Sequence, residues 1–292
     1  MRERILSYLL IVLLLFCAVS SLFLTRGKSV KLASRSRNRI GLVKIYGLIS
    51  VMPSGGDSFF GLRGSDKIVQ QLKRLRKMEV RAVVIRINSP GGTIGACQEI
   101  VEEIRELKKN GIPVVASMGD VAASGGYYVA SACDRILLNR GTMTGSIGVM
   151  MGSSNFEELL DKVGIKPEII KSGKYKDMGA YYREFTDEER NMIQSMVDDT
   201  YGQFLEAVSA GRNIPVEKLR ALAQGQVFTG SQALANGLAD GIGNLNTAVL
   251  AAKDLAKLKG EVEVIEAPGP FEKFFNIVYD VPKGVIDLLR FL

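Results

Sequence analysis

The sequence predicts an α/β domain built on a largely parallel β-sheet. Short runs rich in β-branched residues alternate with longer segments in which apolar residues recur at helical spacing. Repeated strand, turn and helix units of this kind are typical of parallel strands covered by helices. With 292 residues, of which 47% are hydrophobic, the chain can bury the core that such a sheet needs.

The first half of the chain contains three expected strands. The run Val80–Ile87 is rich in β-branched residues, which indicates burial on both faces of the sheet. The expected elements, in chain order, are a strand over Ile40–Ile49, a loop over Met52–Gly64, a helix with Ile68, Val69, Leu72 and Leu75 on one face, the strand Val80–Ile87, a helix with its apolar face over Ile94–Leu107, and a strand over Pro113–Ser117.

The second half begins with another helix and strand and contains one long helix. Thr186 and Glu189 have the spacing of a capping box, which marks the start of this helix. The other expected elements are a helix over Gly125–Ala132, a strand over Arg135–Leu138, a short helix over Asn155–Val163, a strand over Lys166–Ile170, a small helix over Pro215–Ala223 and a closing helix over Asn246–Leu258.

We expect a membrane anchor at residues 1–24. The run Ile5–Leu24 is mostly apolar and has about the twenty residues that a helix needs to cross a bilayer. A cleaved signal peptide is the alternative, because Ala18-Val19-Ser20 offers small residues, but the apolar run continues to Leu24. Basic residues lie on both sides of the run, and the positive-inside rule taken literally would put the large domain in the cytoplasm.

The remaining chain divides into a basic tether at residues 25–39, a folded domain at 40–260 and a C-terminal extension at 261–292. The extension is aromatic and amphipathic, so it either packs on the domain or a neighbouring subunit, or lies at the membrane surface. The formal net charge of +7 is spread along the chain, which predicts no nucleic-acid partner and only a mild attraction to anionic membrane lipid. No phosphate-binding Gly-x-x-x-x-Gly-Lys-Ser/Thr motif occurs, so we expect no nucleotide.

Ser124 is the candidate nucleophile. It follows a strand-like run and a Gly- and Ala-rich turn, and it stands where a helix begins, with Gly125 and Gly126 after it. A serine displayed at such a turn gains the free N–H of Gly125 to stabilise an oxyanion. The alternative interpretation is a helix N-cap serine in a glycine-rich turn.

The chain contains no histidine, so an activated serine needs another base. A lysine becomes a base near neutral pH only when burial lowers its pKa, and an exposed lysine would not serve. Lys171, Lys174 and Lys176 cluster after an expected strand, and their spacing alone does not choose among them. The absence of histidine also excludes a His-ligated zinc site, and we expect neither a metal nor a cofactor. Cys97 and Cys133 are expected to be buried and unpaired.

Several motifs together resemble the bacterial signal peptide peptidase family, also called protease IV, over about residues 40–260. They are Asn88-Ser89-Pro90-Gly91-Gly92, Ala123-Ser124-Gly125-Gly126-Tyr127-Tyr128, Thr144-Gly145-Ser146-Ile147-Gly148, Ser172-Gly173-Lys174-Tyr175-Lys176-Asp177 and Thr229-Gly230-Ser231-Gln232-Ala233-Leu234 with Gly237-Leu238-Ala239-Asp240. The resemblance implies a fold similar to Clp protease and the crotonases, a spiral of β-β-α units, preceded here by one N-terminal transmembrane helix.

The resemblance also implies the roles of individual residues. It makes Ser124 the nucleophile and Lys176, immediately before Asp177, the general base, and it sets Lys174 aside. The hydroxyl of Ser146 would orient the lysine amine. The N–H groups of Gly91 and Gly125 would form the oxyanion hole, and both follow strands at the edge where open α/β sheets place their sites.

As a family member, the chain would be a membrane-anchored, ATP-independent Ser/Lys endopeptidase that cleaves apolar peptides such as remnant signal peptides. Short members form ring-like homo-oligomers in which serine and lysine can come from adjacent subunits, so we expect the monomer to be inactive. The family places its catalytic domain outside the cytoplasm, against the literal charge rule. Two alternatives remain at this point: a crotonase-like acyl-CoA enzyme, and a catalytically inactive peptide-binding membrane scaffold.

Overall fold

The computed structural model describes residues 38–51 and 64–267. The expected anchor at 1–24, nearly all of the tether, the loop from Met52 and the tail after residue 267 lie outside the described residues. Within the described ranges, no helix is both long and apolar enough to cross a membrane.

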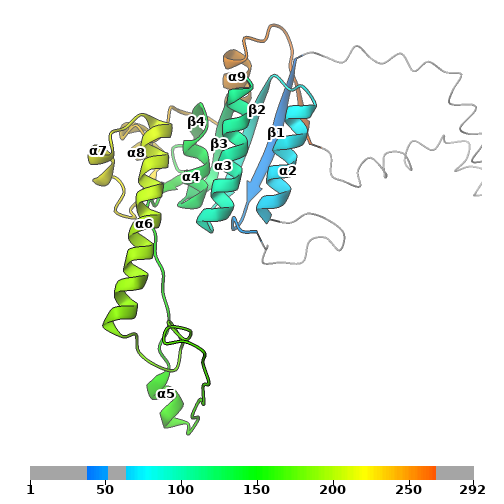
Figure 1. The fold of residues 1–292 in the computed structure, drawn as a ribbon. Coiled ribbons are helices and arrows are strands. Elements are labelled where there is room, and N and C mark those ends of the chain that lie inside the picture. The colour runs from blue at the N-terminus through cyan, green and yellow to red at the C-terminus, as the bar shows by residue number, and fades with distance from the viewer. Residues whose placement is uncertain (1–37, 52–63, 268–292) are drawn as a thin grey trace, which may run out of the picture. The chain divides into compact units, whose positions relative to one another are not determined.

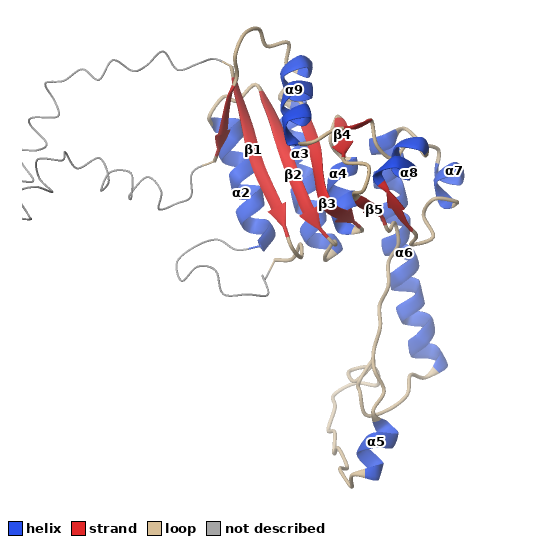
Figure 2. Ribbon diagram, turned by 180° about the vertical axis from the view of Figure 1, so that it is seen from behind, coloured by secondary structure: helices blue, strands red, loops and turns tan. Residues whose placement is uncertain are grey.

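The described residues form one eight-stranded sheet (Figures 1 and 2). Its main path runs β6-β5-β3-β2-β1-β8, with β4 beside β3 and β7 beside β4. The strands are β1 Arg39–Tyr46, β2 Ala82–Ser89, β3 Val114–Ala123, β4 Arg135–Leu138, β5 Met143–Gly145, β6 Val227–Thr229, β7 Gly241–Ile242 and β8 Glu263–Glu266. All pairs are parallel except β5 with β6, so the predicted α/β class is confirmed with a mixed sheet.

Helices cover both faces of the sheet. Along β2, Val83, Ile85 and Ile87 point to a core shared with α2 and α3, while Ala82 and Val84 point to a second core under α9. This alternation explains why β2 is apolar throughout. The helices are α2 Gly64–Lys77, α3 Ile94–Lys109, α4 Gly125–Ser131, α5 Glu157–Lys162, α6 Asp187–Arg212, α7 Val216–Arg220, α8 Gly230–Ala235 and α9 Leu245–Leu255.

Three expected elements differ from the observed ones. β1 ends at Tyr46, because Gly47 turns the chain with φ +73°. β3 continues past Ser117 to Ala123, where its last residues pair with β5. The strand predicted at Lys166–Ile170 is wrong: the segment belongs to no helix or strand and pairs with no described strand, and Ile170 is 96% exposed. Its apolar residues therefore mark an exposed surface rather than a buried strand.

Residues 147–186, which we call the arm, lead away from the sheet and return to the N-terminus of α6 (Figure 1). Helix α6 begins with the predicted capping box, in which Thr186 accepts a hydrogen bond from the N–H of Glu189, and the Glu189 carboxylate accepts one from the N–H of Thr186. Only the second half of α6 is packed against the body, through Phe204, Leu205 and Val208. The first half of α6 and the arm therefore project from the sheet.

Candidate active site

Ser124 lies between the end of β3 and the start of α4, in a strained backbone conformation with φ 50° and ψ −120°. The surrounding hydrogen bonds hold this conformation: the Ser124 N–H donates to Gly145 O over 2.9 Å, and the Ser124 carbonyl accepts from the N–H of Tyr128. The Ser124 side chain makes no capping hydrogen bond. The hydroxyl is thus available for chemistry, which removes the interpretation as a simple helix cap.

A second glycine turn packs directly against Ser124. At Gly91, which has φ +120°, a Cβ would lie 2.8 Å from Ser124 Cβ and 2.9 Å from Gly125 N. A Cβ on Gly125 would in turn lie 2.9 Å from Gly92 N and 2.6 Å from the sulfur of Cys97. The two turns therefore meet as expected, and only glycine permits so close an approach.

The N–H of Gly91 already has a partner, since it donates to the buried Ser89 hydroxyl over 3.1 Å. The Gly91 carbonyl is fixed as well, by the N–H of Ile49. Asn88 ties this turn to the strand that carries Ser124, because its side-chain oxygen accepts from the N–H groups of Asp120 and Val121. These hydrogen bonds replace the regular backbone hydrogen bonds between β2 and β3 at the point where the register of the two strands shifts.

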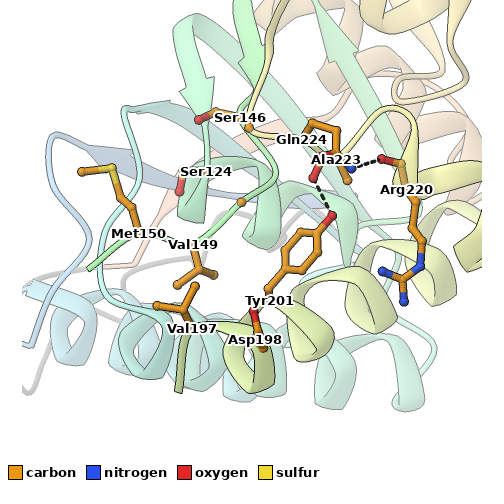
Figure 3. Close-up of a pocket in the computed structure, with 12 residues that line it drawn as sticks. Ser124, Ser146, Val149, Met150, Val197, Asp198, Tyr201, Arg220, Ala223 and Gln224 are labelled. Atoms are coloured by element: carbon orange, nitrogen blue, oxygen red, sulfur yellow. Dashed lines mark hydrogen bonds between the residues drawn. The ribbon is translucent and has the colours of Figure 1, made fainter. Parts of the chain in front are cut away.

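Ser146 follows β5, which pairs with the end of β3 so that Gly145 lies opposite Ala123. Its N–H donates to Gln226 O over 2.8 Å, and it also has positive φ, 49°. The sheet thus delivers Ser146 and Ser124 to the same edge, where both line one cavity (Figure 3).

This cavity has a volume of about 400 Å³ and lies against α6. Figure 3 shows Val197 and Tyr201, from α6, across the cavity from the two serines. The Tyr201 hydroxyl donates to Ala223 O, which fixes the ring as part of the wall. Val197 and Tyr201 have the apolar character and helical spacing of core residues, so the sequence contains no signal that they line a site.

Lys176 is exposed and does not line the cavity. Its loop is bound to the first turn of α6, because Arg183 pairs with both Asp177, next to Lys176, and Glu189. The cavity begins eight residues further along α6, at Val197. At 1.5 Å per residue these points are separated by about 12 Å along the helix. The structure of one chain therefore brings together Ser124, Ser146, Gly91 and Gly125, but not Lys176.

The described segment 171–190 contains five basic side chains, and four of them have partners. Lys171 pairs with Asp177, Arg183 pairs with Asp177 and Glu189, and Arg190 lies over the ring of Phe185. Glu188 raises the pKa of the Lys174 amine through a hydrogen bond, which favours its protonated form. Among the residues that the structure describes, Lys176 has no ion-pair or hydrogen-bond partner for its side chain, so it differs from Lys171 and Lys174.

The described cysteines take no part in this arrangement. Cys97 and Cys133 are buried and unpaired, as predicted, and burial raises the pKa of the Cys97 thiol to about 12, which disfavours a thiolate nucleophile. The described residues also contain no group of three acidic or cysteine side chains that could hold a metal ion.

The sequence of the chain is similar to those of known peptidases. The family model described as peptidase family S49 matches residues 106–259. A putative protease of Synechocystis sp. is 45% identical over 206 residues, which are 70% of this chain and 74% of that protein. A putative signal peptide peptidase, SppA, of Enterococcus faecium is 35% identical over 79% of this chain and 67% of its own length. Protease 4 of Haemophilus influenzae is 36% identical, and the match covers 78% of this chain and 36% of that longer protein.

A solved structure has a similar fold. It is a mutant of the 1510-N membrane-bound stomatin-specific protease in complex with a substrate peptide. The match has a TM-score of 0.50 at 17% sequence identity, and it covers 84% of this chain and all of the other.

Proposed function

Since this chain is a serine protease that belongs to peptidase family S49, we propose that it is a Ser/Lys endopeptidase that cleaves apolar peptides, such as remnant signal peptides, at a membrane. The observation that carries the proposal is the strained, uncapped Ser124 beside a second glycine turn and an open cavity. The acyl-CoA and inactive-scaffold alternatives leave this serine without a role.

In the proposed reaction, the Ser124 hydroxyl attacks the scissile carbonyl carbon and transfers its proton to the Lys176 amine. The ammonium then protonates the departing amine as the peptide bond breaks, which leaves an acyl group on Ser124. Water, deprotonated by the same lysine, releases the acyl group and restores the enzyme. Ser146, at the same sheet edge, accepts or donates a hydrogen bond that orients the lysine amine.

The oxyanion is held by the N–H of Gly125 and by the glycine turn beside it. The N–H of Gly91 exchanges the neutral Ser89 hydroxyl for the charged oxygen, because a hydrogen bond to an ion is roughly twice as strong as one between neutral groups. The nitrogen of Gly92, which lies next to Gly125, offers a further donor. Binding of the oxyanion would thus break the buried hydrogen bond from the Gly91 N–H to the Ser89 hydroxyl.

Lys176 is the proposed base because, of the three lysines in the described segment 171–190, it is the one that no carboxylate holds in its protonated form. A lysine base needs an apolar, water-poor pocket, and one chain leaves Lys176 exposed. The arm also exposes Met150 and Ile170, at 93% and 96%. We therefore propose a ring-shaped homo-oligomer in which the arm packs on an adjacent subunit and delivers Lys176 to that subunit's Ser124.

The cavity beside Ser124 is proposed to receive an apolar side chain of the substrate, since Val149, Val197 and Tyr201 form much of its wall. An anchor at residues 1–24 would keep the enzyme in the bacterial cell membrane, where apolar peptides are concentrated, with the catalytic domain outside the cytoplasm. The reaction as written uses neither nucleotide nor metal.

The test measures cleavage of a signal-peptide-like apolar peptide by the full chain and three variants. Ser124→Ala and Lys176→Ala should each lower kcat by about 10⁴-fold or more, whereas Lys174→Ala, the matched control, should stay within about threefold of wild type. Mixing the two inactive variants before assembly should restore activity, because some sites then receive an intact serine and an intact lysine. Full activity of Ser124→Ala or of Lys176→Ala would contradict the proposed dyad. If mixing the two variants restores no activity, the serine and the lysine of one site come from the same chain.

A further inference from the structure

We propose that Arg183 is a positioning residue, which fixes the segment carrying Lys176 to the first turn of α6 and offsets the charge of the neighbouring Asp177. The inference rests on the proposed role of Lys176 as the base. Neither the sequence motifs nor the family resemblance assigns a role to Arg183.

Arg183 joins two carboxylates with its planar guanidinium group. Its Nε and Nη2 donate to the two Asp177 carboxylate oxygens over 3.1 and 2.8 Å, and its Nη1 and Nη2 donate to the two Glu189 oxygens over 2.9 and 2.6 Å. Nη2 also donates to the Asp177 carbonyl. The side chains of Asp177 and Glu189 are only 10% and 3% exposed, so this is a well-packed network rather than a surface ion pair.

The carboxylates of Asp177 and Glu189 belong to the two parts that Arg183 joins, the segment that carries Lys176 and the first turn of α6. Asp177 follows Lys176 directly, and Lys171 and Tyr182 hold it from the other side. Glu189 closes the capping box with Thr186 and is therefore part of the helix end. Through Arg183, the backbone next to Lys176 becomes an extension of α6. An arginine suits this place because its rigid fork binds two carboxylates at once, which a lysine cannot match.

The same contacts hold the charge of Asp177, the residue next to Lys176 in the chain. The charged groups about this junction are the carboxylates of Asp177, Glu188 and Glu189 and the cations of Lys171, Lys174 and Arg183, with the phenols of Tyr175 and Tyr182 bonded to Glu188 and Asp177. Arg183 holds the pKa of Asp177 well below its usual range and that of Glu189 at about 2, so both stay ionised in any ordinary assay.

An ionised Asp177 without a partner would stabilise a neighbouring ammonium group and oppose its loss of a proton. The positive charges of Arg183 and Lys171 counter this effect. Removing Arg183 should therefore make the base harder to deprotonate, and removing the carboxylate of Asp177 should make it easier. A purely structural role predicts neither change.

The experiment measures kcat, KM and the pH dependence of kcat/KM for the assembled full chain with an apolar peptide. Arg183→Gln should lower kcat at least tenfold with KM within about threefold, and should move the acidic limb of the profile to higher pH. Asp177→Asn should lower kcat but move that limb to lower pH. Arg183→Lys, which keeps the charge, should return the limb close to its wild-type position while recovering kcat only in part.

Glu188→Gln is the matched control, because it removes the exposed pair between Lys174 and Glu188 from the same loop. It should change neither kcat nor the pH profile by more than about twofold. Sedimentation and circular dichroism check that each variant is assembled and folded. If Arg183→Gln does not assemble, the kcat and pH profile of Asp177→Asn test the proposal instead. In that variant Arg183 can still bind Glu189 at the helix end.

A wild-type kcat and pH profile in Arg183→Gln would overturn the proposal. The proposal would also be overturned if Arg183→Gln lost activity only in proportion to its folded fraction and kept the wild-type pH profile. If Lys176→Ala is fully active, the proposed function fails and the role of Arg183 fails with it. If Lys176→Ala is inactive and Arg183→Gln is normal, only the positioning role is lost.

Discussion

The two regions that carry the proposed catalytic groups are built in opposite ways. The turn of Ser124 lies on a parallel sheet with apolar cores on both faces, and strained backbone angles and close glycine contacts define its geometry. Among the described residues, the loop of Lys176 contributes to neither apolar core, and ion pairs and one helix end define its geometry while apolar side chains remain exposed. Apolar packing thus defines the turn of the nucleophile, whereas charged contacts define the loop of the lysine.

This difference indicates which kind of change should harm each region. The body should respond to volume added at the site, because the turns of Gly91, Gly92 and Gly125 have no free space around these glycines. The arm should respond to changes of charge and of surface polarity, because we propose that its exposed apolar side chains pack on an adjacent subunit. Four predictions test the contrast, and the expected effects become smaller from first to last.

Gly92→Ala should have the largest effect. The new Cβ would lie 1.8 Å from Ile49 O, so the bridge between Ile49 and Gly92 has to open. We expect a loss of about 2–4 kcal/mol in the free energy of unfolding and at least a hundredfold loss of peptidase activity. Urea unfolding and peptide cleavage measure the two effects. The control is Gly95→Ala, whose Cβ would meet nothing within 4 Å; equal behaviour of both variants would contradict the packing argument.

Val197→Phe should change the choice of substrate. The larger ring fills part of the cavity beside Ser124, so peptides with a large apolar residue before the cleaved bond should lose kcat/KM relative to peptides with alanine there. We expect the ratio to move by about 10- to 100-fold. Met196→Phe, at the neighbouring exposed position outside the cavity wall, should leave the ratio unchanged. An unaltered ratio in Val197→Phe would mean that this cavity is not the specificity pocket.

Ile170→Asp tests the arm as an assembly surface. A single apolar contact at an interface is worth about 1–2 kcal/mol, so the enzyme concentration needed for half-maximal specific activity should rise about tenfold. The unfolding of the dissociated chain should not change, because Ile170 is 96% exposed. Leu250→Asp, which introduces the same charge on the exposed surface of α9, should leave the concentration dependence as in wild type. If the specific activity of Ile170→Asp depends on enzyme concentration as in wild type, Ile170 does not contribute to assembly.

Gly202→Ala should have the smallest effect, and it should raise the stability of the chain rather than lower it. Gly202 lies in the middle of α6, and a Cβ there would meet nothing within 4 Å. Alanine favours a helix interior by about 1 kcal/mol over glycine, so the urea midpoint should rise while peptidase activity stays within about twofold. A fall in stability would mean that contacts absent from this chain surround Gly202.

The sequence predicted the body well because its signals are local. β-Branched runs gave the central strands, and the capping residues Thr186 and Glu189 gave the start of α6. The turns at Gly91 and Ser124 were expected to meet because both follow parallel strands. The short strands β5, β6, β7 and β8 were missed, since a strand of two to four residues depends on its partner more than on its own composition.

The site was predicted less completely than the fold. Val197 and Tyr201 have the same helical spacing whether they face a core or a cavity, so periodicity does not separate the two. The partner of the Gly91 N–H and the clamp at Arg183 depend on contacts between side chains, which spacing does not encode. The segment Lys166–Ile170 was read as a strand because exposed apolar residues of an arm have the composition of a buried strand.

Among the described residues, only the second half of α6 packs on the body, so its first half behaves mechanically like a beam held at one end. Gly202 is the sixteenth residue of α6, so a bend of about 10° there would move the first turn by about 4 Å at 1.5 Å of rise per residue. A displacement of that size exceeds the tolerance of a proton transfer between positioned groups. In the proposed assembly, the flexural stiffness of the first half of α6 would thus set how accurately Lys176 is placed beside Ser124 of the adjacent subunit.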